Sequence, residues 1–492
     1  MLGWLKRLFA PSKPQSAGRT AGLAKYDAAV TNDDNRAHWA NADGLSANAA
    51  NNPEVRRVLR NRARYEDGNN PHVAGLTQGY SAEGMGTGPR LQLQISGPDV
   101  DFGTPVPSDL PRQIEERWKE WCKAVGLTDE LHTAAETYLR DGEVFAFTFV
   151  NPGLAHPVQL ALRLYEGDQI ATPDRKPDQP VDGIVFDQAG NPVEYHVLKE
   201  HPGDVSLRWG PLSGYDRIPA RQICHLFHRR RPGQARGVPA LSPSLPGYAI
   251  LRRYTLACLL SAEAQARING VIESEHFPAE EDEDPTGQQI QYAGTHLLHL
   301  GAGETAKVLP HSSPPPNHRE FRDSNLTDGG RSVCAPRNIS TGSSAEYNYS
   351  SGRLDTQGWQ RVLRVYRDRV ERRLLDWIFR QWAALALLTP DYLPAGTPPV
   401  DAWRWKWRWD GFGSIDPTKD AKAATERLAN GTSSLDRECG ELGEDWEDVQ
   451  DQRLAEEARE LRRRTELGLP PKAITPAPGA APAVATEVED DA

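Results

Sequence analysis

The segment CHLFH, residues 224–228, contains the side chains that most resemble a metal site. The thiol of Cys224 and the imidazoles of His225 and His228 are all ligands that zinc accepts. Zinc sites use three or four converging ligands, however, and the sequence offers no second ligand pair at a plausible spacing. The segment also lies in a run that alternates like a β-strand. We therefore expect no metal ion here, and no metal site elsewhere in the chain.

The segment DAWRWKWRWDGF, residues 401–412, combines the aromatic and cationic side chains that can bind single-stranded nucleic acid. Its tryptophans alternate with cations: Trp403, Arg404, Trp405, Lys406, Trp407, Arg408 and Trp409. A period of two predicts a strand, with tryptophans on one face and cations on the other. Gripping bases and phosphates together would need both faces. We expect the tryptophans to pack in a core within or between subunits, and the cations to pair with nearby acids.

The glycine spacing does not fit a dinucleotide-binding loop, and the common catalytic signatures are missing, which argues against an enzyme. Gly84, Gly86 and Gly88 precede the alternating run LQLQI, a strand, whereas a dinucleotide-binding loop would open a helix. The sequence contains no G-x-x-x-x-G-K-[ST] loop, no G-x-S-x-G elbow and no H-E-x-x-H pair. We expect no catalytic residue and no cofactor. The alternative is a DNA-processing nuclease whose carboxylate site a single sequence does not reveal.

Composition narrows the class of protein further. A chain of 492 residues exceeds one ordinary core and predicts about two to four subdomains. The net charge of −11 argues against tight DNA binding, because proteins that clamp nucleic acid are usually basic. The five scattered cysteines indicate free thiols made in a reducing compartment. No apolar run reaches the about 20 residues of a membrane span, and the N-terminal apolar run, broken by Lys6 and Arg7, does not indicate secretion.

The periodicity of apolar residues changes several times along the chain. It predicts strands over 143–228 and near 289–300 and 305–309, and helices over 53–66, 111–140, 240–269, 318–335 and 353–388. In the first helix we expect Val55, Val58, Leu59 and Ala63 to share the apolar face, with arginines around it. A further helix begins near Pro417 and ends at Gly431.

The longest predicted helix, 353–388, has the clearest apolar stripe. The stripe recurs at steps of three and four residues: Trp359, Leu363, Tyr366, Val370, Leu374, Ile378 and Trp382. The opposite face is rich in arginine, including Arg361, Arg364 and Arg367. Such a face is usually solvated or paired with acids of a neighbouring subunit, and contact with nucleic acid is the sharper alternative. The stretch 338–352, NISTGSSAEYNYSSG, has no periodicity and predicts a loop.

Seven blocks, in order, resemble the portal proteins of tailed bacteriophages of the lambda type. They are NRARYEDGNNPHVAGLTQGYSAEGMGTGPRLQ (61–92), DGEVF (141–145), YEGDQI (165–170), AGNPVEYHVLKEHPGD (189–204), IPARQICHLFHRRRPGQARGVPALSP (218–243), YNYSSGRLDTQGW (347–359) and IDPTKDAKA (415–423). RPGQARGVP is the most specific of these. The stretch RSVCAPRNIS, 331–340, departs from the family, which usually has a more apolar helix there.

The resemblance implies an α+β portal fold with a β-rich wing, a helical stem, a small α/β clip and a helical crown, assembled as a ring. Mapped by block order, the parts are a mobile N-terminal segment at 1–25, wing at 26–240, stem helix at 241–270, clip at 271–317, second stem helix at 318–337, tunnel loop at 338–352, long helix and Trp strand of the wing at 353–412, crown at 413–466 and disordered tail at 467–492.

The resemblance also implies a function, which is a ring of twelve subunits at one capsid vertex through which double-stranded DNA is packaged and ejected. Its partners would be further copies of the chain, the terminase large subunit, the major capsid and scaffolding proteins, and head-completion or adaptor proteins. It implies location in the virion after assembly in the host cytoplasm, and no membrane. A tail or baseplate structural protein is another alternative. Weak attraction to DNA suits a conduit, because each neutralised phosphate adds affinity.

Three groups of residues follow as candidate contacts. Tunnel-loop residues that would meet the DNA are Asn338, Ser340, Thr341, Ser343, Ser344, Asn348, Ser350 and Ser351; a plain surface loop is the alternative. Residues on the long helix that would meet DNA or a neighbouring subunit are Arg361, Arg364 and Arg367. Acids that would face a docking partner, or form a solvated loop, are Glu280, Glu281, Asp282, Glu283 and Asp284.

Overall fold

The computed structural model describes residues 33, 36–95, 109–172, 182–204, 214–267, 271–274, 304–307, 315–413 and 416–470, with the backbone alone at 264–267, 271–274 and 304–307. The N-terminal segment 1–25, the strand near 289–300, the acidic run 280–284 and the chain after 470 lie outside the described residues. None of the described helices has the length and hydropathy needed to cross a bilayer.

Asparagine–proline pairs begin the first two long helices. After the single turn α1 (Ala47–Ala50), α2 (Pro53–Asn69) and α3 (Pro71–Met85) each carry proline in the first turn. The side chains of Asn52 and Asn70 accept backbone N–H groups that the helix leaves unpaired. The single helix predicted over 111–140 is two helices, α4 (Leu110–Val125) and α5 (Leu127–Asp141), because Gly126 adopts a left-handed conformation between them.

Two small antiparallel sheets follow, so the β-rich region predicted over 143–228 is confirmed. The first has the order β3-β2-β7, and its strands span Leu160–Tyr165, Glu143–Val150 and Ile223–Phe227. The second has the order β4-β5-β6, with strands Ile184–Phe186, Pro192–Leu198 and Tyr215–Pro219. Phe145 of β2 packs with Tyr195 of β5 and with Ile170 in a small core that joins the two sheets.

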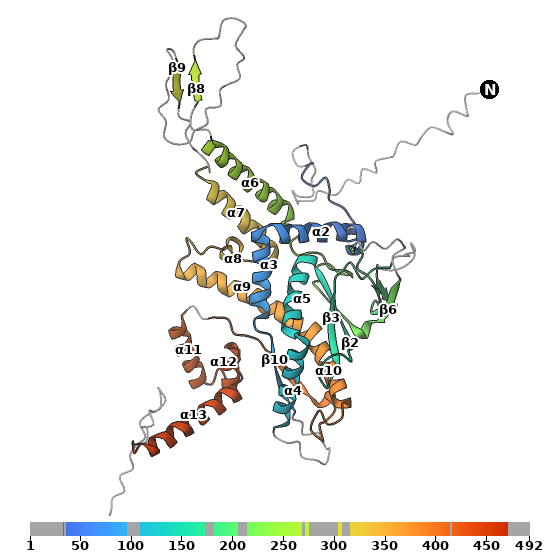
Figure 1. The fold of residues 1–492 in the computed structure, drawn as a ribbon, viewed down its shortest axis with the longest axis vertical. Helices are drawn as coiled ribbons and strands as arrows, with labels where there is room; N and C mark the ends of the chain where they lie inside the picture. Colours follow the sequence, from blue (N-terminus) through green and yellow to red (C-terminus); the bar gives the residue numbers. More distant parts are fainter. Residues whose placement is uncertain are drawn as a thin grey trace, which may run out of the picture.

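A pair of helices projects away from this body (Figure 1). α6 (Leu245–Arg267) and α7 (His318–Gly330) lie side by side, and the short strands β8 (Val271–Ser274) and β9 (Glu304–Lys307) pair beyond their far ends. The predicted helices over 240–269 and 318–335 are confirmed in existence. The second is shorter than predicted, because a 3-10 turn at Arg331–Val333 and a left-handed Cys334 end it.

The predicted long helix is confirmed, with an interruption. It comprises α9 (Tyr349–Val370), one π-helical turn (Glu371–Leu375) and α10 (Asp376–Leu388). All seven stripe residues are buried in the main core. The predicted Trp strand is β10 (Arg404–Arg408), which pairs antiparallel with β1 (Arg90–Gln94) and places Arg408 opposite Arg90.

A helical group follows the Trp strand. It comprises α11 (Pro417–Ala429), α12 (Leu435–Glu441) and α13 (Trp446–Glu466). The predicted start near Pro417 and end at Gly431 are confirmed. Asp416 caps the first turn by accepting from the N–H of Lys419, and Gly431 takes a positive φ of 73° just after the last turn.

The predicted orientation of α2 is wrong. Val55 and Val58 are 38% and 41% exposed, whereas Arg56 and Arg60 are only 3% and 4% exposed. Ala63 does face the core. The arginine face turns inward because buried carboxylates of the sheet region lie beneath it.

Candidate functional site

The predicted tunnel loop, 338–352, is only partly a loop. A short helix, α8, spans Arg337–Thr341, and α9 already begins at Tyr349, so the loop prediction is wrong at both ends. Asn348 caps α9 by accepting from the N–H of Ser351 at 2.8 Å, while the Ser351 hydroxyl accepts from the N–H of Asn348 at 3.1 Å. This capping box fixes the direction in which the chain enters the long helix.

Two of the predicted DNA-contact residues are buried. Ser340 is 3% exposed and its hydroxyl donates to the carbonyl of Pro336 at 2.9 Å; Thr341 is 9% exposed and its hydroxyl donates to Arg337 at 2.8 Å. Ser340 also lies against Gly330, where an added Cβ would meet its hydroxyl at 1.8 Å. Neither hydroxyl is therefore free to meet DNA in this conformation, because both donate to backbone carbonyls at the start of α8.

The other predicted loop residues differ in their exposure and in whether their polar atoms are already used in hydrogen bonds. Ser344, Asn348 and Ser350 are exposed, while Asn338, Ser343 and Ser351 are half-buried. Asn348 and Ser351 spend polar atoms on the capping box, and the backbone N–H of Asn338 donates to Tyr347 at 3.3 Å. The exposed hydroxyls of Ser344 and Ser350 are thus the best placed for contact with another molecule.

The three arginines of α9 that were predicted as contacts differ in burial and in hydrogen-bond partners. Arg367 is 6% exposed, and its guanidinium donates to the carbonyls of Gly84, Asp410 and Glu83 at 2.7, 3.0 and 3.0 Å. Burial lowers its pKa to about 10. These hydrogen bonds tie α9 to the end of α3 and leave little of the Arg367 side chain exposed for contact with another molecule. Arg364 pairs with Glu441 of α12 at 2.9 Å, and Arg361 is exposed.

The Trp strand packs as predicted. Trp403, Trp407 and Trp409 are buried, and Trp405 is half-buried. The indole N–H groups of Trp405 and Trp407 both donate to Asp376, at 2.8 and 2.9 Å.

Hydrogen bonds from the tryptophan indoles also attach the strand β10 to the long helix. The indole of Trp409 donates to Glu371 at 2.6 Å, so acids at both ends of the π-helical turn receive the tryptophans. On the opposite face, Arg408 and Lys406 both pair with Asp436, which confirms the predicted pairing with acids for these two cations.

A buried ionic network, which the sequence did not predict, lies in the body of the molecule. Glu143 is fully buried and accepts from Arg236 at 2.7 and 3.0 Å, from His225 at 3.0 Å and from the N–H of Gly237 at 2.7 Å. Burial alone would raise the pKa of Glu143, but the charge of Arg236 and the hydrogen bond from His225 hold it well below its ordinary value. The carboxylate is therefore ionised.

Arg236 satisfies its remaining donors with backbone. It donates to the carbonyls of Ile170, Asp182 and Gly167 at 3.0, 2.8 and 2.8 Å. The sequence did contain a signal for this ion pair, because Glu143 lies in the family block DGEVF and Arg236 in RPGQARGVP. In the segment CHLFH, His225 is bound to Glu143 and the Cys224 thiol donates to the carbonyl of Arg373 at 3.0 Å.

The arginines of α2 extend the network. Arg60 pairs with Asp168 at 2.5 Å and Arg64 with Asp141 at 2.5 Å, while Arg56 lies 3.6 Å from Asp182. Burial lowers the pKa of Arg56 to about 9, with the like charge of Arg236 adding to the effect. Such an arrangement stabilises only while every charge keeps its partner.

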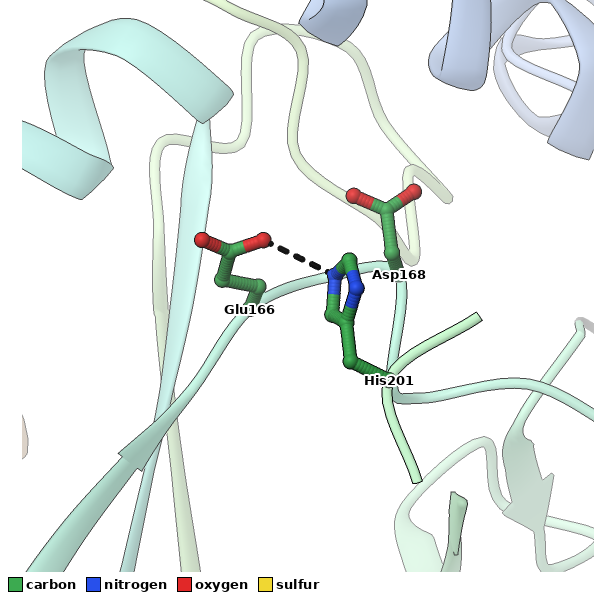
Figure 2. A group of neighbouring side chains, drawn as sticks. All are labelled: Glu166, Asp168 and His201. Carbon is green, nitrogen blue, oxygen red and sulfur yellow. Dashed lines mark hydrogen bonds and ion pairs between the residues drawn. The ribbon is translucent and has the colours of Figure 1, made fainter. Parts of the chain in front are cut away.

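Glu166, Asp168 and His201 lie close enough together to hold a cation (Figure 2). The figure shows His201 bonded to Glu166, and this contact measures 3.0 Å. The guanidinium of Arg64 lies 2.9 Å from both Glu166 and Asp168, so positive charge is already present at the position where an ion would bind. The group fits an arginine-centred ion cluster better than a metal site.

Comparisons with known proteins identify similar chains from two phages. The "Probable portal protein" of Halomonas phage phiHAP-1 is 25% identical over 400 residues, 74% of this chain and 72% of that protein. "Portal protein B" of Escherichia phage lambda is 22% identical over 464 residues, 84% of this chain and 85% of that protein.

Solved structures are similar as well. A chain from "Virion of native gene transfer agent (GTA) particle" matches with 14% sequence identity and a TM-score of 0.43. A chain from "Neck of native GTA particle computed with C12 symmetry" matches with 15% sequence identity and a TM-score of 0.42. Each match covers 85% of this chain and 95% of the solved chain. The model of the family "Phage portal protein, lambda family" matches residues 33–367, more than half of the chain. The chain therefore belongs to the lambda family of phage portal proteins.

Proposed function

We propose that copies of this chain form a ring, of twelve subunits, at one vertex of a phage capsid, and that double-stranded DNA enters and leaves the capsid through it. The proteins of this family are structural, so the chain is not an enzyme. In this proposal the terminase large subunit docks on the ring during packaging, and head-completion or adaptor proteins replace it afterwards. Assembly with the major capsid and scaffolding proteins would take place in the host cytoplasm.

The observation that carries the ring is the apolar surface of α6. Leu256, Leu259 and Leu260 are 57%, 63% and 55% exposed at helical spacings of three and four residues. A contiguous apolar patch of this kind marks a protein interface. A second copy of the chain is its natural partner, because a ring repeats one interface between neighbouring copies. We assign α6 and α7 to the stem, and α11 to α13 to the crown.

Electrostatics supports the conduit. Each subunit carries a net charge of −11, and a ring multiplies that charge around the DNA. Repulsion of phosphates lets a duplex slide, whereas a wall dense in cations would hold it. We propose that Ser344 and Ser350 provide neutral contacts at the narrowest part, and that the acidic run 280–284 faces the docking partner.

Assembly tests the ring directly. We expect purified protein to give rings with a central hole in negative-stain images, and the double variant Leu256→Asp, Leu260→Asp to remain as single subunits. The matched control is Leu388→Asp, an equally drastic change at a leucine that is 77% exposed and lies far along the chain from α6. Circular dichroism should show all three proteins folded. Intact rings in the double variant would contradict the assigned interface, and a wild-type protein that stays a monomer would contradict the ring.

DNA binding tests the conduit separately. We expect duplex DNA to bind the assembled protein only weakly at physiological salt in a fluorescence anisotropy titration. Ser344→Arg should slow genome packaging in a complementation assay, because each added cation contributes attraction to phosphate, while Ser344→Asn should not. Nanomolar affinity of the wild-type ring for duplex would refute the conduit.

A further inference from the structure

A cavity of about 370 Å³ lies between α3, α5, α9 and the segments that follow β7 and α7. Its floor is apolar and aromatic. Tyr80, Tyr138 and Tyr366 pack against one another there, with ring centroids 4.9 and 5.0 Å apart, and Val362 and Val365 extend the wall. None of the exposed leucines of α6 lines this cavity.

The charges at this cavity are unlike those elsewhere on α9. Arg230, Arg361 and Arg369 all line it, and no aspartate or glutamate does. Among the described residues none of the three guanidiniums forms an ion pair within 4.0 Å, although Arg369 is attracted by the neighbouring Asp368 and donates to the hydroxyl of Tyr138. The neighbouring Arg364 and Arg372, by contrast, each pair with a carboxylate.

Two further observations indicate a positive, unsatisfied environment. His228 lines the same cavity, and burial together with the like charges of Arg369 and Arg230 lowers its pKa. The hydroxyl of Tyr366, in a side chain that is 2% exposed, has no hydrogen-bond partner among the described residues. Buried polar groups are normally satisfied, so this hydroxyl is an unused hydrogen-bonding group in a residue of the cavity wall.

We propose that this cavity binds a small phosphate monoester that carries an aromatic or other apolar group. Three guanidiniums without acids suit a doubly charged phosphate, which accepts paired N–H bonds from arginine. The tyrosines and valines suit an apolar body, as in small-molecule sites generally. A duplex is too broad to enter a recess of this volume, so the molecule that fills the cavity itself is a small one.

Calorimetry with defined probes tests both halves of the site. We expect 2-naphthyl phosphate to bind the folded protein with one site per subunit. 2-Naphthol, which lacks the charge, and inorganic phosphate, which lacks the ring, should each bind at least about tenfold more weakly, because each loses one class of contact. Equal binding of 2-naphthol, or no binding of 2-naphthyl phosphate, would overturn the proposal.

Charge reversals locate the site. Arg361→Glu and Arg230→Glu change exposed side chains and should leave the circular dichroism unchanged while weakening 2-naphthyl phosphate at least about tenfold. The matched control is Arg229→Glu, the same charge change at an exposed neighbour of Arg230 that does not line the cavity. Tyr366→Phe should weaken binding by about threefold to tenfold, as loss of one hydrogen bond does. If Arg229→Glu weakens binding as much as Arg230→Glu, the cavity is not the binding site.

Discussion

Two arginine-rich helices of this molecule face opposite ways. In α2 the arginines Arg56 and Arg60 are buried and the valines at 55 and 58 are exposed. In α9 and α10 the apolar stripe is buried, and most arginines face solvent or pair at the surface. Both segments read alike as amphipathic and basic, so residue type alone does not decide which face turns inward.

The difference comes from what each helix covers. Beneath α2 lie the carboxylates of Asp141, Glu143 and Asp168, which are held there by the sheet and by α5. Buried carboxylates need cations more than they need valines, because an unpaired buried charge is very costly. Beneath α9 lie tyrosines, tryptophans and leucines, which select its apolar stripe. The lesson is that burial of arginine follows from convergence of acids, which is a property of the tertiary structure.

The largest expected effect is at the centre of the network. Glu143→Gln removes the charge that faces Arg236 and Arg60, and should lower the free energy of unfolding by about 3–5 kcal/mol. Denaturant titration followed by circular dichroism measures this. The matched change under α9 is Glu441→Gln, which breaks an exposed pair with Arg364 and should cost about 1 kcal/mol or less. Similar losses for both variants would remove the distinction between the two helices.

The apolar helix should respond to truncation of its stripe. Leu363 is fully buried, so Leu363→Ala should cost about 2–5 kcal/mol through lost burial and the cavity left behind. Val365→Ala, two residues along and 60% exposed, is the control and should change stability by about 0.5 kcal/mol or less. The same denaturant titration applies, and a loss below about 1 kcal/mol for Leu363→Ala would show that the stripe contributes little.

The stability contributions beneath α2 and α9 should differ in their dependence on pH. The folded pKa of Glu143 lies below its ordinary value, and so does that of Asp168, where the charge of Arg60 outweighs burial. A carboxylate with a depressed pKa contributes stability that is present above its unfolded pKa, near about 4, and is lost as pH falls through the folded pKa. The stability difference between wild type and Glu143→Gln should therefore shrink from pH 6 to pH 3. The difference between wild type and Leu363→Ala should not follow this trend, and a constant Glu143→Gln difference would contradict an ionised Glu143.

The smallest expected effect is on the outer face of α2. Val58→Asn replaces an apolar side chain that is 41% exposed and should change the free energy of unfolding by about 0.5 kcal/mol or less. A loss above about 1 kcal/mol in the same titration would mean that the valines of α2 stabilise the fold after all.

Patterns that are complete within one segment were predictable from the sequence. The stripe from Trp359 to Trp382 and the alternation of tryptophan with cation each specify an element and its buried face without reference to other segments. The ends of α11 were also predictable, because Asp416 and Gly431 act locally. The portal fold followed from seven ordered blocks, and the family match confirms that resemblance.

Features that depend on distant partners were not predictable. Arg367 is buried because carbonyls of Glu83 and Gly84, over 280 positions earlier, accept its donors. Ser340 is buried because Gly330 leaves room for it. The cavity near Tyr366 combines residues from five segments, and the family blocks at 61–92 and 218–243 that supply some of them do not indicate that these side chains meet. Short polar runs such as 338–352 are predicted as loops because they contain no apolar periodicity. Their helical turns depend on capping and packing hydrogen bonds, which such a pattern does not reveal.

The pairing of β1 with β10 has a consequence for synthesis. Arg90 lies opposite Arg408, 318 positions later. At about 5–20 residues per second, a ribosome needs roughly 15 to 65 seconds to make the partner strand after the first one. During that interval Leu91 and Leu93, buried in the finished protein, lack the tryptophan strand that covers them. A nascent subunit thus cannot complete its core until most of the chain exists, which delays assembly until translation is nearly over and makes the unfinished chain a natural client for chaperones.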